Sequence, residues 1–400
     1  MDALALKLRT NQKYRKLYYA TLYFLLVVFI GITIYETYFD LFISDVILGR
    51  KKLGWKAFIN GETFAKVLQN QNVFYIWIGA CVFAFTIRLI VIIDGYRKSI
   101  IKFGKENFHV NIITFYSTRI VSTITRVLFF SFLGLVVSSS GINYLFKQDF
   151  LSVAGERLTQ YVSNNFPTLF NVSNYWIALF LTIIFIGLPG YIIHYLCHKY
   201  RLMWLLFHKP HHAPTILNPL AMPPTVIFEF LLLLPAALIG VFVSKLFYTE
   251  PLIVETSIWI IAGYGLEVLN HSEVHYEFAY KNFFIRNLCR LFGDKGVYHM
   301  MHHSSHESDL NINLSEGPFH IWDRIFGTYK KPYPTPSKAG LHKNPQIQLN
   351  PLKIIYSGLL QILFELEHNK GFKTKLKILF GTVYYTPPIT KDFLIKEKSN

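Results

Sequence analysis

The sequence predicts an all-α, polytopic membrane protein with about six transmembrane helices and a cytoplasmic, histidine-rich helical cap. Two observations predict this class. Hydrophobic residues make up 52% of the 400 residues and only 16% are charged, and the apolar residues gather in runs long enough to cross a bilayer. Eleven of the fifteen histidines fall between residues 194 and 306, directly after such runs.

The charge and the cysteines exclude several other classes. The net charge is +16, but the basic residues lie between the apolar runs, where cytoplasmic loops of membrane proteins carry them. We therefore expect no nucleic-acid partner. Cys81, Cys197 and Cys289 are too few and too scattered for a disulfide framework, and no C-x-x-C pair offers a thiolate zinc site.

The N-terminal region, residues 1–150, is predicted to hold three spans, at 17–35, 73–93 and 127–145. The first follows a basic segment, which places the N-terminus in the cytoplasm. It is too long for a signal-peptide core and ends in Y-E-T-Y, so we interpret it as a retained anchor. Residues 94–126 are strongly basic, which indicates a cytoplasmic loop or interfacial helix.

The central region, residues 174–330, holds three further spans and the clustered histidines. The span at 174–193 runs toward the cytoplasm and is followed directly by His194. The spans at 225–247 and 252–269 are joined by Y-T-E-P and form a hairpin that returns to the cytoplasm. Counted from a cytoplasmic N-terminus, every histidine cluster therefore falls on one face of the membrane.

The C-terminal region, residues 331–400, contains no run long enough to span a bilayer. It is basic and includes the amphipathic segment P-L-K-I-I-Y-S-G-L-L-Q-I-L-F-E-L. We predict a cytoplasmic helical tail that lies on the membrane or on the central region.

The histidines are spaced as metal ligands. Residues at i and i+4 lie on one face of a helix, and the sequence repeats this spacing in two pairs and two triplets. Neutral imidazole is a common ligand of Fe, Zn, Cu and Ni, and this many groups exceed one site but fit two metals. The predicted ligands are His194, His198, His208, His211, His212, His271, His275, His299, His302 and His303.

Proline complicates one of the triplets. Pro210 lies between His208 and His211, and proline disrupts a helix interior. We expect this segment to be a helix end that runs into a turn, so helical periodicity alone does not bring its imidazoles together.

Other polar residues are candidates to support the ligands, because a ligating histidine usually donates its second N–H to a carboxylate or carbonyl. His306, Glu273, Asp309 and Asn313 are the candidates, and no catalytic residue is predicted beyond the ligands themselves. The remaining histidines match no pair or triplet, and we expect them to be structural: His109, His320, His342 and His368.

The histidine motifs resemble those of the fatty acid hydroxylase and sterol desaturase superfamily. The motifs H-x-x-x-H, H-x-x-H-H and H-x-x-H-H occur in the family's order, and the segment I-W-D-R-I-F-G-T-Y at 321–329 is similar to the family's ending. The resemblance covers about residues 175–330. Beyond it, G-L-H-K-N-P-Q-I-Q-L-N-P-L at 340–352 resembles the alkylglycerol monooxygenase branch and its bacterial relatives.

The resemblance implies a non-haem centre of two iron ions, which zinc can replace during purification, that uses O2 to hydroxylate or desaturate a C–H bond of a fatty acyl chain, ether lipid or sterol. It also implies an external electron donor, either a redox protein or a reduced pterin, because no H-P-G-G haem-binding element is present. The expected location is a bacterial inner membrane or the endoplasmic reticulum, with the site facing the cytoplasm. The oligomeric state is not predicted.

Two other function classes compete with this one. A non-catalytic metal-binding membrane protein or transporter would place its ionisable groups near the bilayer midplane, whereas these histidines follow the span ends. A zinc hydrolase would need about three ligands and a base, and no H-E-x-x-H motif occurs. Metal identity and stoichiometry would separate the three classes.

Overall fold

A computed structural model describes residues 71–109, 164–219, 252–315, 317–341 and 351–390, together with scattered positions between 13 and 24, 111 and 121, 161 and 162, and 242 and 249. In these residues every regular element is helical, and backbone pairing of the β type is limited to two isolated bridges. The predicted all-α class is confirmed for this part of the chain.

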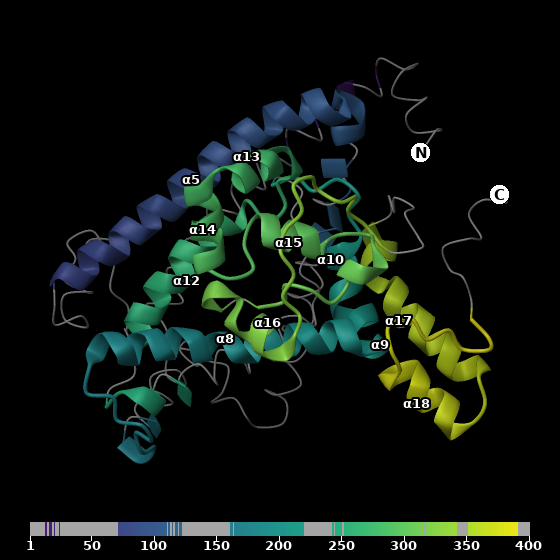
Figure 1. Cartoon of the computed structure of the whole chain (residues 1–400). Helices are drawn as coiled ribbons and strands as arrows, with labels where there is room; N and C mark the ends of the chain where they lie inside the picture. Colours follow the sequence, from purple (N-terminus) through teal and green to yellow (C-terminus); the bar gives the residue numbers. More distant parts are fainter. Residues whose placement is uncertain are drawn as a thin grey trace, which may run out of the picture.

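Two of the predicted spans correspond to long apolar helices. Helix α5, Gln71–Phe103, contains the candidate span Gly79–Phe103, and helix α8, Tyr175–Lys199, is a candidate span throughout. Each candidate span has 25 residues, a length of about 37 Å, which exceeds the hydrocarbon core of a bilayer. Both helices begin at the left of Figure 1 and run to the right, so their C-terminal ends lie on the same side.

The other predicted spans have different outcomes. Helix α12, Ile253–Glu267, replaces the span predicted at 252–269, but its 15 residues are shorter than the roughly 20 that cross a bilayer. The spans predicted at 17–35, 127–145 and 225–247 lie outside the described residues, apart from isolated positions. A total of six spans therefore stays a prediction.

Local chemistry fixes where α8 begins and ends. Asn174 caps its first turn, because its Oδ1 accepts hydrogen bonds from the N–H groups of Trp176 and Ile177 at 3.0 and 3.1 Å. At the other end Tyr200, the residue after Lys199, is extended, which ends the helix at Lys199. The histidine-bearing last turn of α8 is thereby held at the end of the candidate span.

Helix α12 packs closely against α5. A Cβ atom at Gly265 would lie only 2.6 Å from Cα of Ala84, so glycine is needed for the two backbones to approach. One turn further along α5, the buried Arg88 donates from Nη1 to the Tyr264 carbonyl at 2.9 Å and lies over the Tyr264 ring. The guanidinium of Arg88, buried between the two helices, thereby has a hydrogen-bond acceptor and an aromatic face as partners.

Short helices fill the space between α5 and α8 and carry most of the site (Figure 1). Their main apolar core includes the buried side chains of Leu266, Tyr276, Cys289, Val297 and Met300. The elements are the π-helix η1, Trp204–His208; α9, Arg201–Met203; α10, Lys209–His212; the 3₁₀ helices η2, Glu273–His275, η3, Glu307–Asp309, and η4, Pro318–His320; and α13, Tyr276–Lys281, α14, Phe283–Leu291, α15, Val297–His302, and α16, Ile321–Phe326.

The C-terminal region forms a pair of helices, α17, Pro351–His368, and α18, Phe372–Phe380. A buried ion pair joins it to the end of α8, with Arg201 Nη1 2.6 Å from Glu365 Oε2. A Cβ atom at Gly358 would collide with the Leu205 carbonyl, so α17 lies directly against η1. The C-terminal helices therefore support the segment that carries the second histidine motif.

Candidate metal centre

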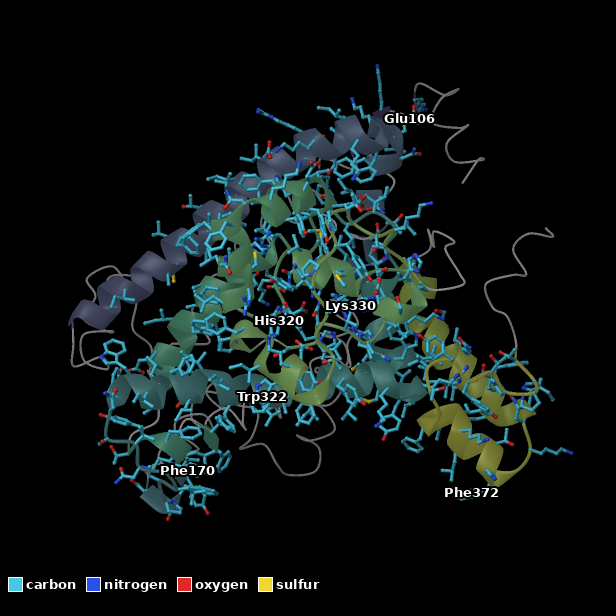
Figure 2. All side chains as sticks on the ribbon, viewed as in Figure 1. Glu106, Phe170, His320, Trp322, Lys330 and Phe372 are labelled. Carbon is cyan, nitrogen blue, oxygen red and sulfur yellow. The ribbon has the colours of Figure 1, made fainter. Side chains whose placement is uncertain are left out.

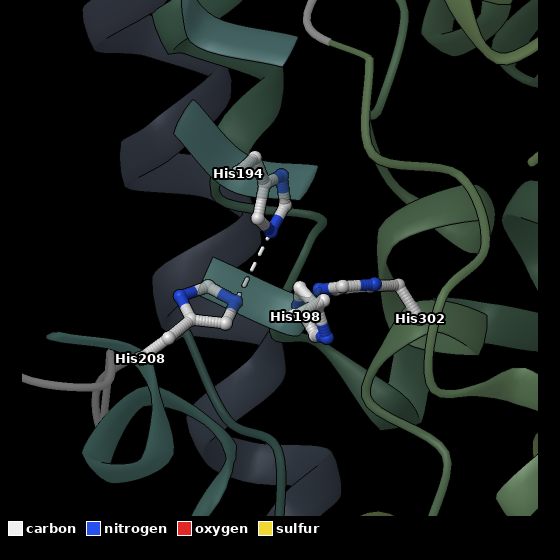
Figure 3. Close-up of side chains that lie close together, drawn as sticks. All are labelled: His194, His198, His208 and His302. Carbon is white, nitrogen blue, oxygen red and sulfur yellow. Dashed lines mark hydrogen bonds between the residues drawn. The ribbon is translucent and has the colours of Figure 1, made fainter. Parts of the chain in front are cut away.

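Two groups of four histidines lie side by side, on α8, η1, α10 and α15 and in the turn after α12. In each group the ring nitrogens that could act as ligands lie within 4.8 Å of one another. The groups come from distant parts of the sequence, which only the fold brings together. The first group, site A, contains His194, His198, His208 and His302 (Figure 3), and the second, site B, contains His211, His271, His299 and His303.

The middle motif lies on a helical segment that includes a π-turn, and its histidines divide between the two sites. The Lys209 N–H donates to the Trp204 carbonyl, five residues earlier, which is the hydrogen bond of a π-turn. The next such bond, to the Leu205 carbonyl, is not possible because Pro210 has no N–H. The chain stays helical through Pro210 and leaves the helix after His212, so the segment is the predicted helix end, although proline does not break it. His208 then faces site A and His211 faces site B.

Helix α15 serves both sites. It begins after Gly296, whose positive φ of 58° suits glycine and whose N–H donates to Asn270 Oδ1 at 2.7 Å. Within its buried turn and a half, His302 points to site A, while His299 points to site B. His303, the residue that ends the helix, also belongs to site B. The i, i+3, i+4 spacing therefore does place three imidazoles together, but around two centres.

Ring nitrogens in site B are at the spacing of ligands on one ion. His303 Nε2 lies 2.9 Å from His299 Nε2, 3.0 Å from His211 Nε2 and 3.1 Å from His271 Nε2. Two nitrogens that each lie ~2.1 Å from a metal and subtend 90–109° are separated by about 3.0–3.4 Å. The arrangement therefore fits a shared metal ion.

Site A has a similar spacing and a fifth imidazole. His194 Nε2 lies 3.1 Å from His208 Nε2 (dashed in Figure 3), and His212 Nε2 lies 3.0 Å from His208 Nε2 and 3.1 Å from His302 Nε2. His212 also stacks on His303 of site B, with ring centroids 4.5 Å apart. His212 is thus the side chain between the two sites.

The tautomers explain why a cation is needed here. Nδ1 of His194 lies 3.0 Å from the Leu314 carbonyl and Nδ1 of His302 lies 3.0 Å from the Ile312 carbonyl. A carbonyl only accepts, so both Nδ1 atoms carry the proton and a neutral ring leaves Nε2 with a bare lone pair. Bare lone pairs directed at their neighbours repel one another unless a cation lies between them.

Burial keeps these imidazoles neutral. Removal from water lowers the pKa of His208, His211, His212, His299, His302 and His303 well below 6.5, and neighbouring imidazoles lower it further. Burial, followed by the charge of Lys295, lowers the pKa of His271 to about 3. At neutral pH these rings therefore offer lone pairs and need not lose protons to bind a metal.

These lowered pKa values predict that the metal-free protein loses stability in mild acid. In the unfolded chain histidine titrates near 6.5. As pH falls below 6.5 these histidines take up protons in the unfolded state but stay neutral in the folded state. Each of them therefore lowers the unfolding free energy by about 1.4 kcal/mol per pH unit. Thermal unfolding of the metal-free protein should shift steeply downward between pH 6.5 and 5 and little between pH 8 and 7. A flat profile across pH 6.5 to 5 would contradict the neutral, buried arrangement.

A carboxylate that sequence reasoning missed orients site B. Asp294 Oδ2 lies 2.6 Å from His299 Nδ1, and both side chains are buried. The acceptor fixes the His299 tautomer and increases the basicity of its Nε2. The sequence signal was available, because Asp294 lies five residues before His299 in the G-D-K-G turn.

We expect Asp294→Asn to weaken metal binding at site B by roughly 10- to 100-fold, because the amide retains the size of the side chain but not its charge. Competition with a chelator, followed by metal analysis, measures the change. The matched control is Glu273→Gln, since the Glu273 carboxylate accepts from Lys102 Nζ at 2.9 Å and supports no imidazole. Equal losses in both variants would show that the effect is general.

A loop at residues 312–315, held by hydrogen bonds to one buried aspartate, orients site A. Asp323 Oδ1 accepts from the Leu314 N–H and Thr328 Oγ1 at 2.7 Å each, and Oδ2 accepts from the Ser315 N–H and His320 Nδ1 at 3.0 Å each. Burial alone would raise the pKa of Asp323, but these hydrogen bonds outweigh it and lower the pKa. The strapped loop presents the carbonyl that accepts from His194.

Neighbouring residues hold the same loop, among them Trp322 and Lys330, which are labelled in Figure 2. Asn313, which has a positive φ of 51°, exchanges hydrogen bonds with the backbone of Lys330 at 3.0 Å. Trp322 Nε1 donates to the Ile184 carbonyl of α8 at 2.9 Å. The W-D-R-I-F-G-T segment therefore fastens the loop, and with it site A, to the candidate span.

The structure does not bring His275 to either site. The i, i+4 argument assumed a helix from His271 to His275, but the segment is a turn followed by the short helix η2. Both His275 nitrogens have other partners: Nδ1 lies 2.5 Å from Ser272 Oγ and Nε2 lies 2.7 Å from Asp94 Oδ2 of α5. His275 thereby joins the His271 segment to α5.

The other predicted supporting residues lie outside the sites. Asp309 accepts from Lys330 Nζ at 2.6 Å, Glu273 pairs with Lys102, and His306 is exposed. Asn313 acts through the loop backbone. Among the histidines predicted to be structural, His320 is buried and donates to Asp323, His109 is buried 3.2 Å from Tyr96 Oη, His368 caps the last turn of α17, and His342 lies outside the described residues.

The donor set fits a pair of metal ions. Both ring nitrogens of His198 are buried with no hydrogen-bond partner among the described residues, and an unsatisfied buried polar atom is costly unless a ligand uses it. All ligand candidates in the two sites are neutral nitrogens, which suit Fe, Zn, Cu and Ni. The two sites therefore offer four imidazoles each, and His212 adds a fifth to site A.

Comparison with protein families gives a match over the histidine-rich region. Residues 179–328 match the family model described as fatty acid hydroxylase. The matched segment contains every member of sites A and B and the loop that Asp323 straps. Neither the comparison with curated proteins nor that with solved structures gives a match.

Proposed function

Because residues 179–328 are a fatty acid hydroxylase domain of the fatty acid hydroxylase and sterol desaturase superfamily, we propose that the protein is an integral membrane, non-haem di-iron oxygenase that hydroxylates or desaturates a C–H bond of a lipid. The observation that carries the proposal is the pair of adjacent all-histidine sites inside this domain. The chemistry that two bound irons would supply is the activation of O2, which no side-chain acid, base or nucleophile can replace at an unactivated C–H bond.

The protein's own residues bind and orient. His194, His198, His208 and His302 would hold one ion and His211, His271, His299 and His303 the other, with His212 between them. Donation from Nδ1 to the Leu314 and Ile312 carbonyls, and to Asp294, keeps each Nε2 unprotonated and aimed inward. Trp204 covers site A, with its ring centroid 5.3 Å from that of His198 and 5.2 Å from that of His212.

The position of the sites supports a lipid substrate. Site A begins on the last turn of α8, whose apolar side chains Phe180 and Ile192 are 47% and 43% exposed. A lipid chain that lies along such a helix would have its carbons within reach of a site at the helix end. The family supports the lipid class, and a fatty acyl chain, an ether lipid or a sterol are the candidates within it.

The electron donor and the branch belong to the same proposal. A reduced pterin would accompany an alkylglycerol monooxygenase activity, which the motif at 340–352 favours, and a small redox protein would accompany the other branches. The orientation of the sites toward the cytoplasm follows from the basic segment before the first predicted span. Either donor would then reach the sites from the cytoplasmic side.

Lipid analysis tests the proposal directly. Membranes from cells that express the protein under labelled dioxygen are compared with membranes from cells that express His302→Ala. A lipid that gains one labelled oxygen indicates hydroxylation, loss of two hydrogens without label indicates desaturation, and cleavage of an ether lipid to an aldehyde selects the alkylglycerol branch. Metal analysis of the purified protein should give two irons per chain.

One outcome would overturn the oxygenase assignment. If the two membranes have the same lipids after a reductant, a pterin and candidate redox proteins have each been supplied, and the metal is a single labile ion, a non-catalytic metal-binding protein fits better. One tightly bound zinc would favour a hydrolase instead.

A further inference from the structure

Helix α18 exposes an apolar stripe that nothing in the described protein covers. Phe372, Leu376 and Phe380 follow one another at i, i+4 and i+8, so they lie on one face of the helix. They are 79%, 40% and 56% exposed. Three large apolar side chains in a row on a helix of nine residues are more than a scattered surface hydrophobe.

Lysines border this stripe on both sides. At 100° per residue, Lys373 and Lys377 fall on one edge of the stripe and Lys375 on the other, and all three are exposed. Helix α18 contains no Asp or Glu. Lysine stems can lie along an apolar surface while their ammonium groups reach anionic headgroups, which is the pattern of a helix in a membrane interface.

The opposite face of α18 is fixed to the protein. Ile378, opposite the stripe, is fully buried, and Leu379, at the edge of the stripe, packs in the cluster that contains Trp204, Leu205 and Ile362. The helix is therefore not free to turn its stripe inward. Its orientation relative to the metal sites is set by the core beneath it.

Hydrogen bonds place α18 at the depth where α8 ends. The Arg201 N–H donates to the Gly381 carbonyl at 2.9 Å and Arg201 Nη1 donates to the Ile378 carbonyl at 3.3 Å. Tyr200 and Thr382 form an antiparallel bridge. These residues come one and two positions after Lys199, the last residue of the candidate span, so the C-terminal end of α18 lies beside the end of α8.

We propose that α18 is an in-plane interfacial helix that docks on anionic lipid at the membrane face where α8 ends, with Phe372, Leu376 and Phe380 in the acyl boundary and the three lysines at the headgroups. The proposal rests on α8 crossing a membrane and is independent of the reaction. Through the Arg201–Glu365 pair and the contact of Gly358 with Leu205, docking holds the metal sites at a fixed height above the lipid.

A spin label on the full-length protein in lipid nanodiscs tests the docking. Leu376→Cys is labelled in a Cys81→Ser background, since Cys197 and Cys289 are buried. The matched control is Glu367→Cys on α17, a position whose native side chain is 77% exposed. In discs that contain anionic phosphatidylglycerol, the label at 376 should collide more with O2 than with a water-soluble nickel chelate, and the label at 367 should do the reverse.

The lysines are tested in the same measurement. Replacing Lys373, Lys375 and Lys377 by Gln, or using discs of neutral phosphatidylcholine alone, should weaken docking by roughly fivefold per lysine charge lost. Metal content should stay unchanged in all of these variants, which shows that they fold.

Three results would overturn the proposal. Equal nickel access at 376 and 367 in anionic discs would mean that the stripe faces water. Exclusion of both O2 and nickel at 376 would mean that protein, such as a second copy of the chain, covers it. A depth of the label at 376 that changes neither with anionic lipid nor with the lysine substitutions would contradict docking on anionic lipid. None of these readouts depends on turnover, so they are distinct from a failure of the oxygenase assignment.

Discussion

The variant His302→Ala is expected to abolish lipid oxidation and to release metal from site A. His302 is fully buried, and its Nε2 lies 3.1 Å from that of His212, while its Nδ1 is fixed by the Ile312 carbonyl. Removing the ring deletes a ligand and leaves a cavity that no neighbouring donor fills. Loss of a residue that only supports a ligand costs 10- to 100-fold, so we expect a loss of activity of at least about 100-fold.

Metal analysis and the lipid product are measured together in this variant, because the two readouts separate a lost ligand from a lost fold. The matched control is His306→Ala, four residues further along, where the side chain is exposed and lies outside both sites. That control should retain both metals and full turnover. Retention of two metals and normal turnover in His302→Ala would refute site A.

The second large effect is expected from Asp323→Asn. Each carboxylate oxygen of Asp323 accepts two hydrogen bonds, from the Leu314 N–H and Thr328 Oγ1 or from the Ser315 N–H and His320 Nδ1. In the asparagine variant one of these oxygens becomes an NH2 group, which would face two donors and could accept from neither. Breaking charged hydrogen bonds at a buried group costs about 2–4 kcal/mol of unfolding free energy. The loop that orients His194 and His302 would loosen as a result.

Site-resolved metal affinity distinguishes this effect from general destabilisation. Asp323→Asn should weaken site A by roughly 10- to 100-fold, whereas Asp294→Asn should weaken site B. Reciprocal losses of this kind identify Asp323 as a positioning residue of site A. If Asp323→Asn lowers the thermal midpoint but leaves both affinities unchanged, its role is confined to stability.

Much of this protein could be predicted from spacing and composition alone. The apolar runs predicted the long helices α5 and α8, because a bilayer demands a length and a composition that a sequence displays openly. The i, i+3, i+4 spacing at His299, His302 and His303 predicted a shared helical face, since helical periodicity is a local property. The motifs likewise indicated the family that the comparison later matched.

Tertiary structure alone decided how the ligands divide between two sites. His208 and His211 face different centres, and His299 and His302 divide in the same way on the regular helix α15, so the i, i+3 spacing does not tell which centre each imidazole serves. His275 has ligand spacing, yet it lies between Ser272 and Asp94, because the segment after His271 is a turn and not a helix.

The backbone partner of His194 was equally hidden, because it is set by a contact between segments far apart in the chain, whereas Asp294 lies only five residues from the His299 that it orients. The Leu314 carbonyl reaches His194 across 120 positions, and it does so through the loop that Asp323 straps. A backbone carbonyl has no side chain to mark it in a sequence. Local periodicity thus determined which residues can be ligands, and the packing of distant segments determined what each ligand binds with and what holds it in place.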